Sequence, residues 1–222
     1  QIVTWNSKRY IEDCLDSVFE QTFEDFSVMV IDNKSSDGTV ELVRANYPTV
    51  SVLQNIKNTG FSKANNQGIH LSKAQYVLVL NPDVILEADF LQNLLATADE
   101  HTKAGSFSPK VFKLFSQAYD AKDQSGLREA VRSNVIDSTG LVLHKSRFAV
   151  NRGESQKDEG KYKREEEIFG ASGAVVLYRK EALEEIAIKN EFFDQDFFAY
   201  KEDIDLAWRL RIYGWECWYS PD

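Results

Sequence analysis

The feature that most constrains the fold is an alternation of short β-rich runs and helix-like segments across residues 1–101. The β-rich runs are Ile2–Thr4, Phe26–Ile31, Val50–Leu53 and Tyr76–Leu80. The last run is apolar throughout, which is typical of a strand buried on both faces of a parallel sheet. Segments with helical spacing or composition follow the runs, at residues 10–19, 39–47, 61–72 and 88–101. This order predicts an α/β fold with a mostly parallel sheet and right-handed crossovers.

Polar clusters follow three of these predicted strands. They are Thr4-Trp5-Asn6, Asp32-Asn33 and Asn81-Pro82-Asp83. In open parallel sheets, ligands bind beyond the carboxyl ends of the strands. The three clusters therefore predict a ligand site along one edge of the sheet.

The second half of the chain is less regular. Strands are expected at 106–114, 138–143, 173–178 and 215–220, and helices at 180–188 and 202–213. The polar stretches 117–133 and 148–167 have no periodicity, and we expect the second to be an exposed, mobile loop. Because no repeat or low-complexity linker divides the sequence, we expect one domain over residues 1–222. Both ends fall at a predicted strand, so we expect the sequence to be trimmed from a longer protein.

The formal net charge of −9 argues against a nucleic-acid-binding protein, which would carry a basic patch. An acidic protein that binds an anionic ligand needs a local cation. Cys14 and Cys217 are expected to be buried thiols in a reducing compartment, and the three histidines lack a zinc-binding spacing. No apolar run approaches the ~20 residues of a membrane helix, and no signal peptide is visible. These observations predict a cytoplasmic protein.

Two glycine-containing segments have the composition of ligand-binding turns. The segment DNKSSDG at 32–38 follows a buried strand, and its carboxylates and backbone suit either a nucleotide or an ordinary connection between elements. In NTGFSKANNQG at 58–68, Gly60 precedes a helix whose free N–H groups could bind an anion, with Lys63 nearby. The pair Asn65-Asn66 interrupts the helical pattern without a visible packing reason. A capped amphipathic helix is the alternative.

Two acidic motifs complete the set. Asp83 offers one hard oxygen ligand, of the kind that Mg²⁺ or Mn²⁺ prefers, although Asn-Pro-Asp is also a common turn. Glu202, Asp203 and Asp205 open a predicted helix after the aromatic-rich segment 192–200. The helix dipole stabilises acidic side chains at this end of a helix, which is a purely structural explanation. A carboxylate beside apolar side chains can also act as a general base.

Together these motifs resemble those of the family 2 glycosyltransferases, which have the GT-A fold. The resemblance covers nearly the whole chain and depends on several motifs in the same order. They are VTWN at 3–6, IDNKSSDGT at 31–39, NTGFSKANNQG at 58–68, LNPDV at 80–84, FGASGAVVLYRKEAL at 169–183 and FFDQDFFAYKEDIDLAWRLRIYG at 192–214. Within the family, DSTGLVL at 137–143 and FGASGA at 169–174 are most similar to the bacterial rhamnosyltransferase-like branch.

The resemblance implies a nucleotide-sugar-binding half (1–100) and an acceptor-binding half with the catalytic base (101–222). The implied donor-binding residues are Thr4, Asn6, Asp32, Asn33, Asn58, Gly60, Lys63, Asn65 and Asn81. The implied acceptor-binding residues are Gly170, Ala171, Ser172, Gly173 and Tyr200. Asp83 would hold Mg²⁺ or Mn²⁺ on the diphosphate, and Asp203, with Glu202 beside it, would be the base.

The implied reaction is a single displacement that inverts the anomeric centre of the transferred sugar. Asp203 would take the proton of an acceptor hydroxyl while the metal stabilises the departing nucleotide diphosphate. The family suggests a surface polysaccharide or lipid-linked acceptor, made at the inner membrane face with peripheral membrane association, and a rhamnose-type donor. Two departures are visible: Asn81 stands where many members carry a first metal-binding Asp, and the sequence ends before a His that many members have.

Two other functions fit parts of the pattern. A sugar nucleotidyltransferase also uses a parallel α/β sheet and Mg²⁺, but it would carry a Gly-rich basic loop near the N-terminus, and residues 3–9 contain no Gly. A non-catalytic binding module of the same fold would be indicated by loss of the acidic pair, and Glu202 and Asp203 are both present. A dinucleotide oxidoreductase is disfavoured because no GxGxxG follows any predicted strand.

Overall fold

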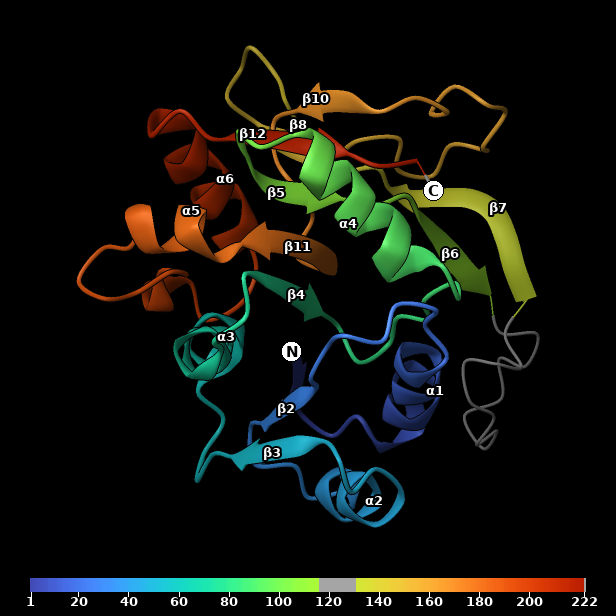
Figure 1. Cartoon of the computed structure of the whole chain (residues 1–222), viewed down its shortest axis with the longest axis vertical. Helices are drawn as coiled ribbons and strands as arrows, with labels where there is room; N and C mark the ends of the chain where they lie inside the picture. The colour runs from blue at the N-terminus through green and yellow to red at the C-terminus, as the bar shows by residue number, and fades with distance from the viewer. Residues whose placement is uncertain (116–130, 222) are drawn as a thin grey trace.

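The computed structural model describes residues 1–115 and 131–221 (Figure 1). Its strands are β1 (Ile2–Thr4), β2 (Met29–Asp32), β3 (Ser51–Gln54), β4 (Tyr76–Leu80), β5 (Ala104–Ser108), β6 (Val111–Phe115), β7 (Val131–Ser138), β8 (Leu141–Leu143), β9 (Ala149–Asn151), β10 (Glu166–Ile168), β11 (Val175–Arg179) and β12 (Glu216–Tyr219). Its α-helices are α1 (Lys8–Phe19), α2 (Thr39–Asn46), α3 (Gly60–Leu71), α4 (Phe90–Glu100), α5 (Lys180–Glu185) and α6 (Glu202–Ile212). Within these residues, no helix is both long enough and apolar enough to cross a membrane.

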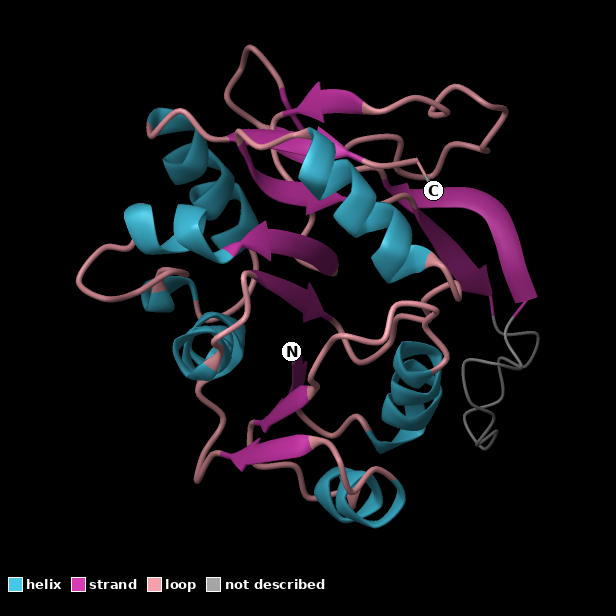
Figure 2. Ribbon diagram, in the orientation of Figure 1, coloured by secondary structure: helices cyan, strands magenta, loops and turns pink. Residues whose placement is uncertain are grey.

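Eight strands form one mixed sheet in the order β10-β12-β5-β11-β4-β1-β2-β3. The pairs β1–β2, β2–β3, β1–β4 and β5–β12 are parallel. Strand β11 runs antiparallel to both of its neighbours, β4 and β5, and β10 runs antiparallel to β12. The predicted mostly parallel α/β sheet is confirmed. Two small antiparallel sheets, β6–β7 and β8–β9, stand apart from it (Figure 2).

The sheet lies between two layers of helices, with α1, α2 and α4 on one face and α3, α5 and α6 on the other (Figure 1). Strand β4 shows why: Leu78 and Leu80 pack into the first core, whereas Val77 and Val79 pack into the second. Because side chains alternate along a strand, an apolar run buried on both sides forms the centre of such a sheet. The thiols of Cys14 and Cys217 are buried and free, as predicted.

Two predicted strands are each divided in the structure. The run at 106–114 becomes β5 and β6, because Pro109 between them has no N–H to donate to a ladder. The run at 138–143 is interrupted at Gly140, whose φ of 101° turns the chain between β7 and β8. Most of the predicted irregular segment 117–133 lies outside the described residues.

The predicted loop at 148–167 is largely exposed, as expected, but strands at both of its ends correct the expectation of an irregular segment throughout. Its first residues form β9, which pairs with β8, and its last residues enter β10, which pairs with β12. Between them, the ring of Tyr162 is buried, and Asp158 forms an ion pair with Lys110 at 3.1 Å. These contacts hold the segment against residues that are distant in the sequence. Contacts of this kind produce no periodic pattern in the sequence, so they could not be predicted from it.

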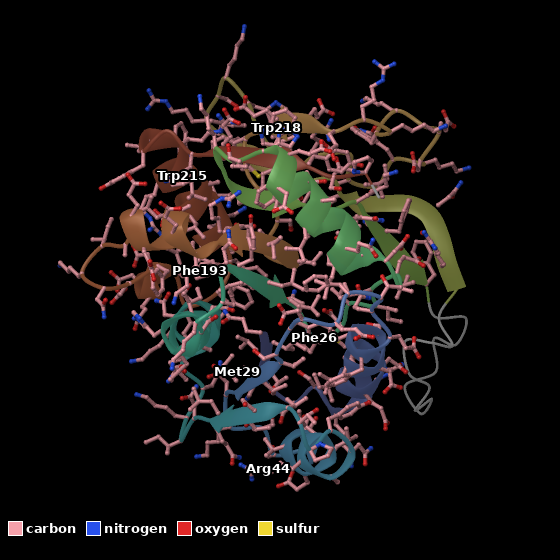
Figure 3. All side chains as sticks on the ribbon, viewed as in Figure 1. Phe26, Met29, Arg44, Phe193, Trp215 and Trp218 are labelled. Carbon is pink, nitrogen blue, oxygen red and sulfur yellow. The ribbon has the colours of Figure 1, made fainter. Side chains whose placement is uncertain are left out.

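The Asn65-Asn66 pair has a packing reason that the sequence analysis missed. The side chain of Asn66 is buried and binds the backbone of a segment about 127 residues further along. Its Nδ2 donates to the Phe193 carbonyl at 2.7 Å, and its Oδ1 accepts from the N–H groups of Phe192 and Phe193 at 3.2 and 2.8 Å. Asn66 therefore joins α3 to the chain that leads into α6, next to the buried ring of Phe193 (Figure 3).

We expect Asn66→Ala to lower the free energy of unfolding by about 3 kcal/mol, because two N–H groups and a carbonyl would lose their partner in a buried place. Urea denaturation followed by circular dichroism measures this. The control is Gln67→Ala, one position along the same helix, whose partly buried side chain bonds to Asn55 instead. Equal effects of the two substitutions would contradict the role given to Asn66.

Candidate functional site

The paired ends of β1 and β2 place Thr4 beside Asp32, as the parallel register requires. The Thr4 hydroxyl donates to Asp32 Oδ1 at 3.0 Å, and Ser35 donates to the same carboxylate through its N–H at 2.9 Å and its hydroxyl at 2.5 Å. Thr4 and Asp32 are both fully buried. The structure thus brings two predicted donor-binding residues together, with the carboxylate already bound to the turn that follows it.

The two asparagines at these strand ends differ in exposure. Asn6 is exposed, with a φ of 54°, and its Oδ1 accepts from the Ser36 N–H at 2.9 Å. Asn33 is buried; its Nδ2 donates to the Gly60 carbonyl at 3.0 Å, and its Oδ1 accepts from the Thr59 hydroxyl at 3.0 Å. Asn33 therefore fastens the loop before α3 to the end of β2, and Asn6 remains at the surface.

The start of α3 is covered, which corrects the expectation of an open anion site there. The Phe198 carbonyl accepts from the N–H of Phe61 at 2.6 Å and of Ser62 at 3.3 Å, and Asn58 Oδ1 accepts from the Gly60 N–H at 2.9 Å. Gly60 has a φ of 84°, and a Cβ there would lie 2.5 Å from the Phe198 oxygen. Glycine is needed for this close approach. The donors that a phosphate would use are occupied by a carbonyl from far along the chain.

The other predicted residues of α3 point in different directions. Lys63 is exposed. Asn65 is buried; its Oδ1 accepts from Gln1 Nε2 at 2.6 Å, and its Nδ2 donates to the Phe61 carbonyl at 3.1 Å. Asn65 therefore joins α3 to the start of the chain, while Lys63 is free to meet a ligand from solvent.

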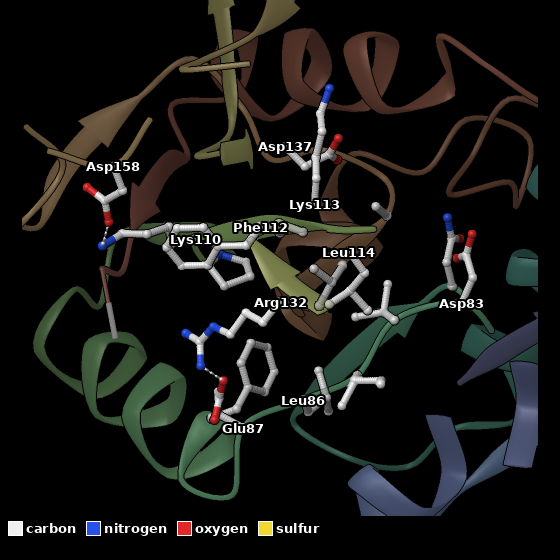
Figure 4. Close-up of a pocket in the computed structure, with 18 of the residues that line it drawn as sticks. Asp83, Leu86, Glu87, Lys110, Phe112, Lys113, Leu114, Arg132, Asp137 and Asp158 are labelled. Atoms are coloured by element: carbon white, nitrogen blue, oxygen red, sulfur yellow. Dashed lines mark hydrogen bonds and ion pairs between the residues drawn. The ribbon is translucent and has the colours of Figure 1, made fainter. Parts of the chain in front are cut away.

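Asp83, which follows β4, lines a cavity of about 1510 Å³. Asn81 lines the same cavity and is held at the sheet edge because its N–H donates to the Ala174 carbonyl at 2.8 Å. Figure 4 shows Asp83 at one end of this cavity and the ion pair of Lys110 and Asp158 at the other. The Asp83 carboxylate is exposed. A carboxylate and an amide oxygen that line the same cavity are ligand types that Mg²⁺ or Mn²⁺ accepts, together with phosphate oxygens and water.

Asp137 is a cavity residue that was not among the predicted site residues. It comes from β7 and is half buried, and burial raises the pKa of its carboxyl, an effect that Lys113 opposes and that Glu154 and Asp83 reinforce. The motif DSTGLVL, which begins at this residue, was the available signal. Lys113 and Arg132 also line the cavity, and Arg132 pairs with Glu87 (Figure 4).

The acidic pair at the start of α6 lies next to Gly173. The Gly173 N–H donates to Asp203 Oδ2 at 3.2 Å, and the Ile204 N–H donates to Asp203 Oδ1 at 2.8 Å. Gly173 directly precedes Ala174, whose carbonyl accepts from the Asn81 N–H, so Asp203 lies near the turn after β4 that contains Asp83. Ala174 lines the cavity, whereas Asp203 is not among its lining residues. The link between Asp203 and Asp83 is the antiparallel pairing of β4 with β11.

Glu202 is only 6% exposed, and its Oε2 has no hydrogen-bond partner among the described residues. Burial raises the pKa of this carboxyl to about 7, and the neighbouring Asp203 adds to the effect. Near neutral pH, Glu202 is therefore protonated in a large share of molecules, which reduces charge repulsion against Asp203.

The predicted acceptor residues are divided between the interior and the surface. Gly170 and Ala171 are buried, and a Cβ on Gly170 would lie 2.4 Å from the Ala207 methyl of α6. Ser172 and Gly173 are half exposed. Tyr200 is 85% exposed, with a φ of 72°. Residues 170–171 thus pack against α6, and the partly exposed Gly173 contacts Asp203.

Curated relatives cover nearly all of this chain. The N-acetylglucosaminyl-diphospho-decaprenol L-rhamnosyltransferase of Mycobacterium tuberculosis is 26% identical over 99% of the chain and 72% of its own length. The poly-beta-1,6-N-acetyl-D-glucosamine synthase of Staphylococcus aureus is 25% identical over 99% of the chain. The chain spans 47% of the length of that synthase.

Solved structures with the same fold include GalNAc-T7 with UDP, GalNAc and Mn²⁺, at a TM-score of 0.72 and 14% identity, covering 99% of this chain and 41% of that one. The mannosyltransferase PcManGT of Pyrobaculum calidifontis, with GDP-Man and Mn²⁺, has a TM-score of 0.63 at 19% identity, covering 100% of this chain and 53% of that one. These likenesses establish the GT-A fold. Residues 1–187 match the family described as glycosyl transferase family 2. The chain therefore belongs to glycosyl transferase family 2 and is a glycosyltransferase of the GT-A fold.

Proposed function

We propose that this chain is an inverting, metal-dependent glycosyltransferase in which Asp203 is the general base. The observation that carries the proposal is the position of Asp203, bound at 3.2 Å to the N–H of Gly173, whose neighbour Ala174 lines the cavity together with Asn81 and Asp83. Residues 1–100 form the donor half and residues 101–222 the acceptor half of one domain. A base and a phosphate-binding edge must lie close together, since proton removal and departure of the nucleotide occur in one displacement.

Among the donor-binding candidates, Asn6 and Lys63 are exposed and meet the ligand directly in this proposal. Thr4, Asp32 and Asn33 are buried and shape the nucleotide pocket through the turn and the loop that they hold. The start of α3 is occupied by the Phe198 carbonyl, so other groups must neutralise the diphosphate. Asp83 and Asn81 would hold a divalent cation, which supplies positive charge to the leaving diphosphate when bound.

In the reaction step, Asp203 removes the proton of the acceptor hydroxyl as that oxygen attacks the anomeric carbon. Glu202, whose raised pKa keeps it largely neutral, leaves the negative charge on Asp203. The two N–H groups bonded to Asp203 fix the orientation of its carboxylate. In this proposal Ser172, Gly173 and Tyr200 border the acceptor, and the hydroxyl-bearing end of the acceptor lies in the cavity under β6 and β7, where Asp137 and Lys113 can bind further hydroxyls.

We propose a surface polysaccharide or a lipid-linked glycan as the acceptor. The mycobacterial relative is named for the transfer of L-rhamnose to N-acetylglucosaminyl-diphospho-decaprenol, which supports a rhamnose donor and a lipid-linked acceptor for this chain. A lipid-linked acceptor requires peripheral association with the inner face of the membrane.

We expect a nucleoside diphosphate to stabilise the protein only when a divalent cation is present, and we expect Asp83→Ala to reduce that effect. At 100 times Kd the stabilisation is about 2.7 kcal/mol, which raises the melting temperature by several degrees. Differential scanning fluorimetry with UDP, GDP or dTDP, in Mn²⁺ or in EDTA, measures it. Asp89→Ala, at an exposed position of the same cavity, is the matched control. Equal shifts in Mn²⁺ and EDTA would refute a metal at Asp83.

Asp203→Asn should lower turnover by roughly 10²–10⁴ and leave donor affinity nearly unchanged, because the amide cannot accept the proton. The measurement is release of nucleoside diphosphate from a donor sugar in the full-length enzyme. Asp205→Asn is the control, since Asp205 lies in the same first turn and forms an ion pair with Arg209 at 2.8 Å. Normal turnover in Asp203→Asn would overturn the mechanism.

The raised pKa of Glu202 also predicts a pH dependence of stability. Between its usual pKa near 4.5 and about 7, only the unfolded state ionises, so stability should fall as pH rises through this window. Glu202→Gln should therefore raise the free energy of unfolding at pH 8, by up to about 3 kcal/mol, and change it little at pH 4. Urea titrations at both pH values test this, with the exposed Glu159→Gln as control. A wild type and a Glu202→Gln variant of equal stability at pH 8 would show that burial does not penalise this carboxylate.

A further inference from the structure

A second group of candidate metal ligands lies at the opposite end of α4 from the cavity. Glu100 is the last residue of α4, His101 follows it, and Glu165 directly precedes β10. One ligand atom from each side chain lies within 4.8 Å of the others. Helix α4 begins at the cavity with Phe90, and its 11 residues span about 16 Å. The group is therefore separate from Asp83.

The imidazole of His101 is held in one orientation. Its ring stacks on Trp218 with centroids 3.5 Å apart and an angle of 11° between the planes, beside the end of α4 (Figure 3). Its Nε2 points at Glu165 Oε2, 3.0 Å away. The backbone is fixed as well, because the His101 carbonyl accepts from the Ala104 N–H at 2.9 Å. The ring thus presents Nε2 toward Glu165.

Glu165 is oriented by a neighbour that is not itself a ligand. The Thr97 hydroxyl lies 2.7 Å from Glu165 Oε1, which leaves Oε2 directed at His101. Metal sites commonly hold their ligating carboxylates through such a second hydrogen bond. The side chains of His101 and Glu165 are 21% and 33% exposed, so a cation and its remaining water ligands can enter from solvent.

One imidazole and two carboxylates suit Zn²⁺, which binds nitrogen at about 2.0–2.1 Å and oxygen at about 2.0–2.2 Å. Around a tetrahedral ion, such ligand atoms lie about 3.3–3.6 Å apart. The 3.0 Å between His101 Nε2 and Glu165 Oε2 is close to that value, and the exposed Glu100 side chain places a carboxylate oxygen within 4.8 Å of the other two ligand atoms. The carbonyl end of α4 and the two carboxylates also favour a positive charge at this point.

We propose that Glu100, His101 and Glu165 form a binding site for a divalent transition metal of the zinc class. Its position at the end of α4 and the start of β10 makes it a structural clamp: it joins a helix of one layer to the strand at the edge of the main sheet. The site is independent of catalysis, so its test does not depend on the proposed transferase activity.

Zn²⁺ binding to the full chain is measured by isothermal titration calorimetry and by the shift in melting temperature. In the absence of a nucleoside diphosphate, where Asp83 and Asn81 offer only two ligands, we expect one saturable equivalent and a higher melting temperature with Zn²⁺ in the wild type. Both should be lost in Glu165→Gln, which keeps a hydrogen-bonding side chain, and in His101→Ala. Both should be kept in His144→Ala, an exposed histidine elsewhere, and in Asp83→Ala.

A second readout guards against misfolding of His101→Ala, whose ring also packs on Trp218. Circular dichroism in EDTA establishes whether each variant is folded, and Co²⁺ absorption in the wild type reports the coordination geometry. The proposal is overturned if the wild type binds no Zn²⁺ saturably, or if a folded Glu165→Gln binds it as well as the wild type does. If Asp83→Ala loses Zn²⁺ binding while Glu165→Gln and His101→Ala keep it, the bound metal lies in the cavity, and the proposed site at Glu100, His101 and Glu165 is refuted.

Discussion

The antiparallel pairing of β11 with β4 is the contact on which the site depends. Five residue pairs join the two strands, from Val175 with Leu80 to Arg179 with Tyr76. Each strand sends alternate side chains into both cores, so the pairing is buried on both faces. Because Asn81 continues this ladder to Ala174, the turn after β4 and the start of α6 meet at one edge. This contact is what brings the start of α6, with Asp203, toward the turn that contains Asp83.

The contact between α3 and residues 192–198 has a consequence for electrostatics. Asn66 binds the backbone of Phe192 and Phe193, and the Phe198 carbonyl covers the first N–H groups of α3. The end of a helix that commonly attracts phosphate is here used to hold the segment before α6. In a chain of net charge −9, the N–H groups at the start of α3 are therefore not available to an anion, because the Phe198 carbonyl accepts from them.

The sequence predicted the elements of the first half closely. Strand β4 has the predicted bounds, and α3 begins one residue before the predicted start, at Gly60. Local signals are strong there, since each strand is a short apolar run followed by turn residues. At residues 148–167 the sequence did not reveal β9, β10 or the buried Tyr162, because these depend on pairing with β8 and β12 and on packing against distant residues. Such contacts join distant parts of the chain and leave no periodicity in it.

The sequence by itself determined the α/β class, the mostly parallel sheet and the family, because strand and helix periodicity and the ordered motifs are properties of neighbouring residues. Only the tertiary structure decided which polar residues of the motifs are buried and which are exposed. Asn65 and Asp32 belong to motifs that also contain exposed residues, yet both are buried in hydrogen bonds, whereas Asp137 joins Asp83 in the cavity from a separate strand. Exposure and hydrogen-bond partners depend on segments that lie far apart in the chain and meet only when the sheet closes between its helices.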